Sequence, residues 1–457
     1  MERLIRLTIN KNCLNCKICC RFSEENSNLK PSGLTLKKHN DLFVCSGFNI
    51  EKNNCKIYSK RPTDCQLYPY VIAKSEDEEN ILLAIDNTCP NTEEIISKLS
   101  TLNLSQIKFP AEDAIKWEDS FVPIKILQNT NHKSQTLNKL TINDRLFFNQ
   151  FLPEDSFLSA YTFAYHFIWE DTTSYFWKMI DNSFCLFAKN GNEIFMPIAP
   201  LNLHNNIEEV FKKCFDIMNF YNENKPRTRY WCGGKEISRI ENVSEDTITS
   251  LSPNEFKIFK KDDEYIYKTE NLSTLKGDKY KTFRWLCNVF EKENKYSYEE
   301  YNETHLAGCV GLLNIWLNEK FKKTKTDYEK FLLQHANTSH KKIFTNYKKL
   351  GLIGRVVVDK TKETVIAYTF GCSINKDVFC ILTEVSNQKI KGASPFIFKE
   401  FCNELKDFKY INTMGDEGIG SLRFNKLKYK PEFKKVNYTI MDKNSVSVTR
   451  DILSTTQ

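Results

Sequence analysis

The stretch that decides the fold is RVVVDKTKETVIAYTFGCSI, residues 355–374, together with DVFCILTEV, residues 377–385. The apolar runs of the first piece are rich in β-branched and aromatic residues. They flank the polar segment 360–363, which predicts a hairpin that turns there. The second piece predicts a further strand. The segment SPFIFKEFCNELK, residues 394–406, predicts a helix whose start is capped by its Ser-Pro pair.

Further segments complete this region: a strand, a helix and a strand at residues 409–414, 420–428 and 433–441. The order hairpin, strand, helix, strand, helix, strand resembles that of the GNAT acyltransferase core. A similar order starts earlier, where SFCLFAKNGNEIFMPI, residues 183–198, predicts a hairpin around an Asn-Gly turn. The segment NIEEVFKKCFDIMNFY, residues 206–221, then predicts an amphipathic helix. Element order therefore predicts two GNAT-like units in tandem.

A second resemblance covers residues 140–445. It is carried by LTINDRLFFNQFL at 140–152, DEYIYKTENLSTLKGDKYKTFRWLCNVF at 263–290 and GDEGIGSLRFNKLKYKPEF at 415–433. These stretches resemble the bacterial family that shares the C-terminal catalytic domain of phosphatidylglycerol lysyltransferase, which is related to the Fem peptidyltransferases. Trp285 departs from the family pattern, in which an Asn usually follows the Arg. The matching positions are Tyr265, Tyr267, Leu275, Gly277, Lys279, Arg284, Asn288, Phe290, Gly420, Leu422, Lys426, Lys428 and Pro431.

Cysteines are concentrated near the start of the chain. Eight of the sixteen lie in the first 89 residues, at Cys13, Cys16, Cys19, Cys20, Cys45, Cys55, Cys65 and Cys89. The first residues have no apolar segment that would serve as a secretory signal, so we expect a cytosolic protein with reduced thiols. The spacing C-x-x-C-x-x-C turns several sulfurs toward one ion, as zinc and iron-sulfur sites both require. The pattern therefore predicts a metal site and leaves zinc and iron open.

This region, residues 10–92, resembles the YkgJ-type cysteine-cluster family, which is described as zinc- or iron-chelating. The motifs that carry the resemblance are CLNCKICCRF and CKIYSKRPTDCQLYPY. Lys17 stands where the family often has Gly. Eight thiolates would build two four-Cys sites, or one cluster with spare cysteines, and the adjacent Cys19 and Cys20 would diverge. A domain this small would gain much of its folding free energy from the metal.

The expected fold class is α+β, with a small metal-stapled domain followed by tandem GNAT-like domains. The expected boundaries are 1–92 for the cysteine domain, 93–136 for a polar linker, and 137–275 and 276–457 for the two units. No apolar run reaches the ~20 residues of a membrane-spanning helix. The net charge of +7 would suit an anionic partner. We expect a bacterial, cytoplasmic protein, with a peripheral membrane association as a further expectation.

GNAT-type transfer positions a donor ester or thioester beside a nucleophile and stabilises the developing oxyanion. The turn that would bind the pyrophosphate of acyl-CoA is SNQKIKGAS, residues 386–394, and its spacing departs from the usual Q/R-x-x-G-x-G/A. Aminoacyl-tRNA, the donor that the lysyltransferase resemblance implies, is therefore at least as well supported as acyl-CoA. The acceptor would be a lipid headgroup or an amine.

Glu384, at the end of a predicted strand, is the candidate general base, with Asp416 and Glu417 as alternatives. Acids at strand ends also cap helices or stay solvated, which is the competing interpretation. His335 and His340 are expected to face solvent. The candidate substrate- or phosphate-binding residues are Arg284, Lys279, Lys391, Gly392, Arg423, Lys426 and Lys428. The last three of these also fit the solvated face of an amphipathic helix.

Together these features predict an acyl- or aminoacyltransferase that carries a zinc- or iron-binding cysteine cluster. The alternative is an iron-sulfur redox or sensing protein in which the GNAT-like region only binds a partner. A non-catalytic metal-binding adaptor is a third possibility.

Overall fold

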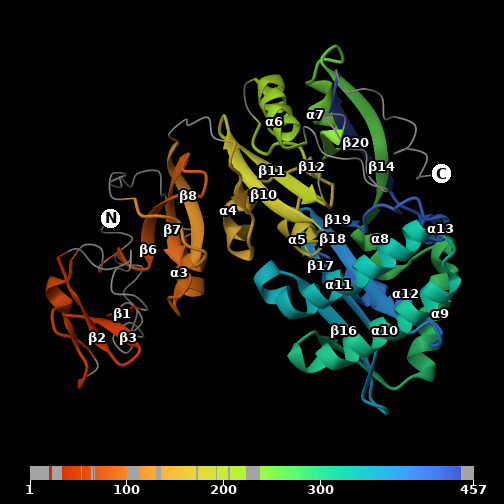
Figure 1. Ribbon diagram of the computed structural model, residues 1–457. Helices are drawn as coiled ribbons and strands as arrows, with labels where there is room; N and C mark the ends of the chain where they lie inside the picture. Colours follow the sequence, from red (N-terminus) through yellow and green to blue (C-terminus); the bar gives the residue numbers. More distant parts are fainter. Residues whose placement is uncertain are drawn as a thin grey trace. The chain divides into compact units, whose positions relative to one another are not determined.

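The chain divides into two units, residues 1–150 and 151–457, and each is described by itself. The fold is known from a computed structural model (Figure 1). It describes residues 20–22, 33–52, 54–62, 65, 67–99, 114–129, 135–170, 173–191, 193–203, 206–222 and 237–443.

The first unit contains an antiparallel sheet of three strands in the order β6-β7-β8. Leu83, Ile85 and Val122 of this sheet form a core with Ile95 of helix α3. The linker expected at 93–136 is wrong in part, because β8 lies within it and pairs with β7. A long polar run follows β8 in the sequence, and for this reason the apolar residues of β8 were included in the predicted linker. The element bounds are β6 (Tyr70–Lys74), β7 (Asn80–Asp86), α3 (Thr92–Leu99), β8 (Phe121–Asn129), β9 (Asn138–Lys139), η6 (Ile142–Asp144) and α4 (Arg145–Asn149).

The cysteine region has short strands and a small core. Phe22, Leu36, Val44, Cys45 and Phe48 are its buried cluster. Cys20, Leu34 and Phe43 are partly buried against it. The bounds are β1 (Arg21–Phe22), β2 (Leu36–His39), β3 (Leu42–Cys45), β4 (Phe48–Asn49), β5 (Asn54–Cys55) and η3 (Tyr58–Lys60).

The first half of the second unit begins with an antiparallel meander of β10, β11 and β12. The predicted hairpin is confirmed, but Asn190 is still paired with Glu193, so the connection begins at Gly191, whose φ of +57° glycine adopts without strain. The predicted helix at residues 206–221 is α6. After it, Ile240 of β13 forms a parallel β-bridge with Met196. The bounds are α5 (Phe163–Phe167), β10 (Ser174–Ile180), β11 (Ser183–Asn190), β12 (Glu193–Phe195), α6 (Ile207–Asn222) and β13 (Arg239–Val243).

The second half repeats this arrangement. Strands β16, β17 and β18 form an antiparallel meander, α12 crosses over, and β19 pairs with β18 in parallel. The predicted hairpin, strand, helix, strand, helix, strand order is confirmed. The bounds are β16 (Ile353–Asp359), β17 (Thr364–Ser373), β18 (Val378–Ser386), α12 (Ala393–Glu404), β19 (Tyr410–Asn412), α13 (Gly420–Lys428) and β20 (Phe433–Asp442).

The two halves exchange their last strands. Each half ends with a helix and a long strand: α7 (Glu245–Thr249) and β14 (Phe256–Lys268) in the first, α13 and β20 in the second. However, β14 pairs with β19 of the second half, and β20 pairs with β13 of the first. The sheet therefore runs β13-β20-β14-β19-β18-β17-β16-β15. The halves share one sheet, and β14 lies among the strands of the second half although it precedes the expected boundary at 275.

Helices cover the part of this sheet formed by the second half (Figure 1). Within the described residues, no helix is long and apolar enough to cross a membrane. The expectation that His340 faces solvent is wrong: its ring is buried in α11, and its Nδ1 lies 2.8 Å from the Tyr368 hydroxyl. The remaining bounds are α8 (Thr269–Thr274), η8 (Asp278–Tyr280), α9 (Lys281–Glu293), β15 (Tyr296–Glu300), η9 (Glu303–His305), α10 (Leu306–Lys323) and α11 (Asp327–Leu350).

Candidate active site

A cavity of ≈ 650 Å³ opens in the second unit beside the end of β18. Its wall is built from β18, the start of α12, the β19–α13 segment, α10, α11 and residues of the first half. Many of the lining side chains are aromatic, and the ionisable ones include three acids and three lysines. These are Glu241, Glu384, Glu417, Lys261, Lys320 and Lys426. Such a concave, mostly apolar site with a few polar groups is typical of a ligand pocket.

Glu384 is an acid on this wall whose carboxyl group is buried and only partly hydrogen-bonded. Its Oε1 accepts a hydrogen bond from the Ser394 hydroxyl at 2.9 Å, and its Oε2 is buried without a hydrogen-bond partner. Burial raises the pKa of Glu384 from 4.5 to about 7, although the hydrogen bond from Ser394 acts in the opposite direction. A carboxyl group with this pKa exchanges a proton near neutral pH, as a general base must.

The start of α12 explains how Ser394 reaches Glu384. The predicted Ser-Pro cap is wrong, because the N-cap residue is Gly392, with a φ of +81°. A Cβ atom at this position would clash with the carbonyl oxygen of Leu286, so glycine is required by space as well as by conformation. Ser394 consequently lies inside the first turn of α12, where its hydroxyl orients the carboxyl group instead of capping the helix.

Helix α13 forms another part of the wall. Leu422, Asn425 and Lys426 recur on one face of this helix and line the cavity, followed by Tyr429. The Lys426 ammonium donates to the Thr413 carbonyl oxygen. Burial lowers the pKa of Lys426 from 10.5 to about 8, and neighbouring acids act in the opposite direction. The cavity therefore has a cation as well as an acid that titrate near physiological pH.

Three tyrosine hydroxyls hold α13 in place. Tyr267 donates to the carbonyl oxygen of Lys426 at 2.9 Å, and Tyr280 donates to that of Tyr429 at 3.2 Å. Tyr265 donates to Asp416, in the loop before the helix, at 2.5 Å. Because two of these tyrosines lie on β14, the exchanged strand of the first half positions a wall of the cavity.

Asp416 is saturated with hydrogen bonds. Its side chain is 2% exposed, and Arg423 binds both of its carboxylate oxygens, at 2.9 and 3.1 Å. Burial alone would raise the pKa of Asp416, but the hydrogen bonds from Arg423 and Tyr265 lower it below its usual value. Asp416 is absent from the residues that line the cavity. This geometry is that of a structural ion pair, and it also holds the guanidinium of Arg423, a predicted phosphate ligand.

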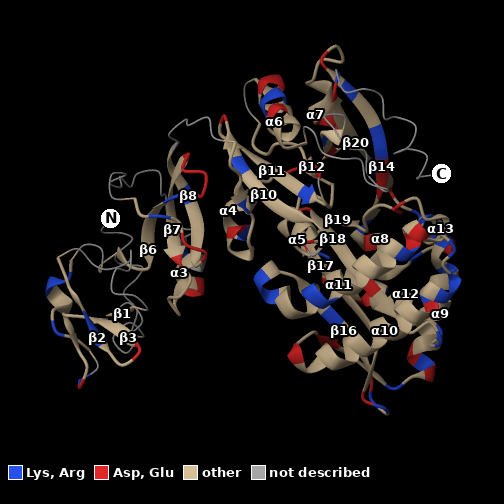
Figure 2. Ribbon diagram, viewed as in Figure 1, with Lys and Arg blue, Asp and Glu red and all other residues tan. Residues whose placement is uncertain are grey.

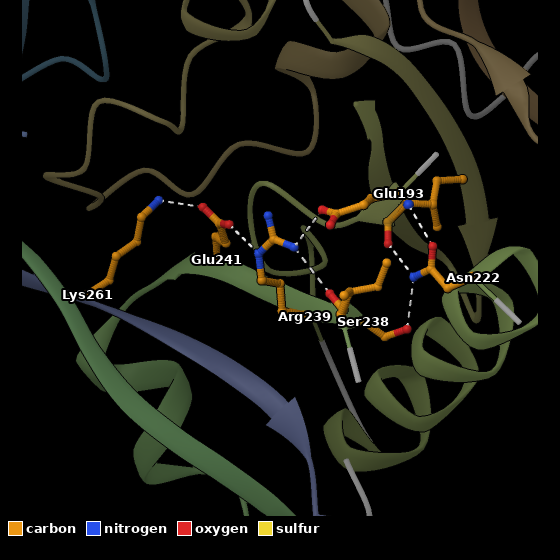
Figure 3. A network of polar contacts seen from close by, with 8 residues as sticks. Glu193, Asn222, Ser238, Arg239, Glu241 and Lys261 are labelled. Carbon is orange, nitrogen blue, oxygen red and sulfur yellow. Dashed lines mark hydrogen bonds and ion pairs between the residues drawn. The ribbon is translucent and has the colours of Figure 1, made fainter. Parts of the chain in front are cut away.

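A largely buried ionic network reaches the cavity from the first half of the unit (Figure 3). Arg239 lies between two acids, 2.6 Å from Glu241 and 3.3 Å from Glu193, and Lys261 lies 2.5 Å from Glu241. Burial would raise the pKa of Glu241, but Lys261 and Arg239 outweigh it and lower that pKa to about 2. Glu241 and Lys261 line the cavity as a charged pair. The ion pair between Glu241 and Lys261 holds both side chains in one orientation, so this part of the cavity wall is polar and rigid.

In the cysteine domain, Cys13, Cys16 and Cys19 lie outside the described residues. Among the residues that are described, no three His, Cys, Asp or Glu side chains converge as metal ligands. Cys45 is buried at the end of β3, and its Sγ accepts the backbone N–H of Gly47 at 3.4 Å. An N–H donated to sulfur favours the thiolate, which is the form that ligates zinc and iron. The donor chemistry of this region therefore fits such a metal.

Comparison with known families identifies both parts of the chain. Residues 155–441 match the model of the family described as phosphatidylglycerol lysyltransferase, C-terminal. The chain belongs to this lysyltransferase C-terminal family. Its fold is α+β with tandem GNAT-like units, and the family is one of acyl- or aminoacyl-transferases. Residues 12–90 match the CxxCxxCC domain, for which zinc or iron chelation is proposed.

Solved structures that are similar to the second unit include three from bacteria. A conserved protein of unknown function from Bacteroides thetaiotaomicron shares the fold with a TM-score of 0.59 and 22% identity, over 67% of this chain and 99% of its own. L-PGS from Bacillus licheniformis has a TM-score of 0.43 and 16% identity, over 63% of this chain and 89% of its own. A C-terminal domain of a lysylphosphatidylglycerol synthetase homologue from Agrobacterium fabrum has a TM-score of 0.45 and 13% identity, over 66% and 92%. No curated protein matches the chain.

Several residues predicted from the lysyltransferase family pattern lie away from the cavity. Arg284 donates to the carbonyl oxygens of Leu275 and Gly277, so it closes the turn after α8. Other predicted ligands rest on aromatic rings: Lys279 on Tyr280, Lys391 on Trp285 and Lys428 on Phe424. Of the residues predicted for the second unit, the structure thus brings Glu384, Glu417 and Lys426 together at the cavity, whereas the others are not among the residues that line it.

Sequence reasoning missed the helical wall of the cavity. Trp316 and Lys320 of α10, and Phe331 and His335 of α11, line it. His335 was expected to face solvent, but its ring lies 3.9 Å from that of Phe331, and burial lowers its pKa. In each helix the aromatic residue precedes the basic residue by four positions, which places both side chains on the same helical face. That repeated spacing was the available signal.

Proposed function

We propose that the second unit transfers an aminoacyl group from aminoacyl-tRNA to a hydroxyl or amine acceptor, with Glu384 as the general base. The observation that carries this proposal is the state of Glu384. It lines the cavity with one carboxylate oxygen bound to Ser394 and the other without a partner, and its pKa is about 7. Membership of the lysyltransferase family supports the reaction class.

In the proposed step, the acceptor O–H or N–H gives its proton to the carboxylate of Glu384. The acceptor atom forms a bond to the ester carbonyl carbon of the donor. The tetrahedral intermediate then collapses, the ester C–O bond breaks, and the ribose hydroxyl leaves with a proton returned by the acid form of Glu384. Ser394 keeps the carboxyl group in one orientation, which favours a productive approach. No covalent enzyme intermediate is needed.

Two observations favour an aminoacyl ester over acyl-CoA. First, the turn before α12 uses backbone N–H groups internally: Lys389 donates to the Asn387 side chain, Ile390 to the Asn387 carbonyl, and Ala393 to the Ile390 carbonyl. These groups are then not available to a pyrophosphate. Second, the acids and lysines on the cavity wall are balanced in number, which suits an amino acid better than a polyanion.

The test supplies the two donor classes side by side. Full-length protein is incubated with radiolabelled aminoacyl-tRNAs or with radiolabelled acetyl-CoA, in each case with a bacterial lipid extract and with small amines as acceptors. Transfer of label from aminoacyl-tRNA alone supports the proposal. Transfer from acetyl-CoA alone, or hydrolysis of aminoacyl-tRNA without any labelled acceptor, contradicts it.

For the cysteine domain, we propose that it binds zinc or iron through thiolates drawn from Cys13, Cys16, Cys19, Cys20, Cys45, Cys55, Cys65 and Cys89. The match to the chelating domain and the N–H bond to the Cys45 sulfur support this. A bound ion would link segments that the small core of β1, β2 and β3 holds only weakly.

A further inference from the structure

Part of the cavity wall is aromatic and carries no charge. Residues 156–169 contain no Lys, Arg, Asp or Glu, and helix α5, which lies within them, is tan in Figure 2. Tyr165 and Trp169 of this segment line the cavity, and so does Tyr175 of β10. Rings of this kind bury a large apolar group favourably and have no charge to be compensated.

The two tyrosines of this wall are held in place by a buried histidine. The His166 ring contacts the rings of Tyr165 and Tyr175 edge to face, with ring centres 5.3 and 5.4 Å away. The Nε2 atom of His166 lies 2.7 Å from the carbonyl oxygen of Ala160, which fixes the ring. The wall is therefore already in place before a ligand enters, which lowers the entropy cost of binding.

Helix α11 is joined to the same segment. Lys342 donates a hydrogen bond to Glu170 at 3.4 Å, and its ammonium lies 5.4 Å from the centre of the Phe167 ring. Phe331 and His335, earlier on the helix, line the cavity. Positions 331, 335 and 342 lie on one helical face. This face of α11 therefore extends from the cavity to the aromatic segment.

The carboxylates of the cavity are poorly suited to a cationic ligand. Glu241 already binds Lys261 at 2.5 Å, and Glu384 is the candidate base. Burial raises the pKa of Glu417, and the charges of Lys261 and Lys426 act in the opposite direction, so two lysines already lie near this acid. A lysyl or arginyl group would therefore add a buried charge without an acid of its own to pair with.

Aromatic rings also attract ammonium groups, but cations of the chain itself already lie on two rings of this cavity. The Lys320 ammonium lies 5.6 Å from the centre of the Trp316 ring. The guanidinium carbon of Arg239 lies 4.2 Å from the centre of the Phe195 ring. Both rings line the cavity. A cationic ligand would meet like charges at these rings, whereas an uncharged aromatic ligand would not.

We propose that the cavity selects a donor whose amino acid is aromatic, and that Trp169 and Phe331 determine this selectivity. The inference rests on the proposed transfer from aminoacyl-tRNA and names the class of aminoacyl group. It differs from the lysyl group that the description of the family names. An aromatic side chain would pack edge to face or offset against these rings, whereas an alanyl group would leave the space beside them unfilled.

The first test measures binding without tRNA. Isothermal titration calorimetry on the full chain compares the amides of phenylalanine, alanine and lysine, which carry the α-amino group and carbonyl of an aminoacyl ester. We expect phenylalanine amide to bind at least ~10-fold more tightly than the other two, because an aromatic side chain is buried. Trp169→Ala and Phe331→Ala should each remove most of this difference. Phe331 is 43% exposed, so its replacement spares the core, and circular dichroism checks each variant.

Trp285→Ala is the matched control, because Trp285 is 51% exposed and is absent from the residues that line the cavity. This variant should bind the three amides as the wild type does. Equal binding of the three amides by the wild type, tighter binding of lysine amide, or a preference that persists in both Trp169→Ala and Phe331→Ala overturns the proposal.

The second test measures transfer from one tRNA that is aminoacylated in turn with phenylalanine, alanine and lysine, so that only the side chain differs. Trp169→Ala should lower kcat/KM for the phenylalanyl donor at least ~10-fold relative to the alanyl donor. An equal loss with all three donors would assign the ring to stacking on a nucleotide and overturn the proposal. Selective binding of phenylalanine amide without transfer from any of the three would support the aromatic pocket and contradict the transfer reaction.

Discussion

Replacing Glu384 by glutamine is the sharpest perturbation that the structure offers. The amide has the same shape, and its oxygen can still accept the hydrogen bond that the Ser394 hydroxyl donates at 2.9 Å. What disappears is the ability to take a proton. A general base contributes about 10²- to 10⁴-fold to a rate, so Glu384→Gln should lower the single-turnover transfer rate by about that factor.

The same variant should change the pH dependence of stability. In the folded protein, burial raises the pKa of Glu384 from 4.5 to about 7. Between these values the unfolded chain has already released the proton that the folded protein retains, so wild-type stability falls as pH rises through this window. The shift corresponds to at most ~3 kcal/mol above pH 7. Glu384→Gln removes this contribution and should be more stable than the wild type at pH 8.

Two measurements check this reasoning: single-turnover transfer, and urea unfolding at pH 5 and pH 8. Glu417→Gln tests the competing assignment, because Glu417 lines the same cavity, in the loop before α13, and is the alternative candidate base. If Glu384 is the base, the transfer rate of Glu417→Gln should stay within about tenfold of the wild type, short of the 10²- to 10⁴-fold loss expected on removing a general base. Transfer by Glu384→Gln at the wild-type rate would refute the assignment of the base.

Two other predictions follow from the structure. Asp416→Asn should lower the free energy of unfolding by about 1–3 kcal/mol, because it weakens the charge-assisted hydrogen bonds to Arg423. Transfer should persist at temperatures below the melting transition of this variant. Unchanged stability together with a transfer rate as low as that of Glu384→Gln would instead make Asp416 catalytic. Metal analysis of the full chain should find zinc or iron that the triple variant Cys13→Ser/Cys16→Ser/Cys19→Ser loses, with the transferase unit still folded. A metal-free wild type, purified without oxygen and without chelators, would contradict the metal site.

Local elements could be predicted from the sequence because their signals are local. The Asn190-Gly191 turn and the apolar runs on both sides of residues 360–363 lie within a few residues of the contacts they specify. Helices α6 and α13 have the periodicity expected of them. Glu384 was identified as a candidate because an acid at the end of this strand is close to the GNAT-type transfer site.

The exchange of β14 and β20 could not be predicted in the same way. Register pairs such as Asp262 with Asn437 join positions far apart in the sequence, and the apolar pattern of a strand does not specify its partner. The saturation of Asp416 by Arg423 and Tyr265 depends on that exchange, since Tyr265 lies on β14. From the sequence, Asp416 and Glu384 were therefore both candidate bases. Only their hydrogen-bond partners in the fold show that Asp416 is a structural group and that Glu384 remains the candidate base.

The pH profile of the transfer step tests the central claim most directly. Single-turnover transfer by the wild type is measured from pH 5 to pH 9, with the aminoacyl ester at saturating protein. The account predicts a rate that rises with pH and levels off with a midpoint near the Glu384 pKa of about 7, a dependence that Glu384→Gln abolishes. A rate that is independent of pH across this range, or a midpoint that is unchanged in Glu384→Gln, would contradict it.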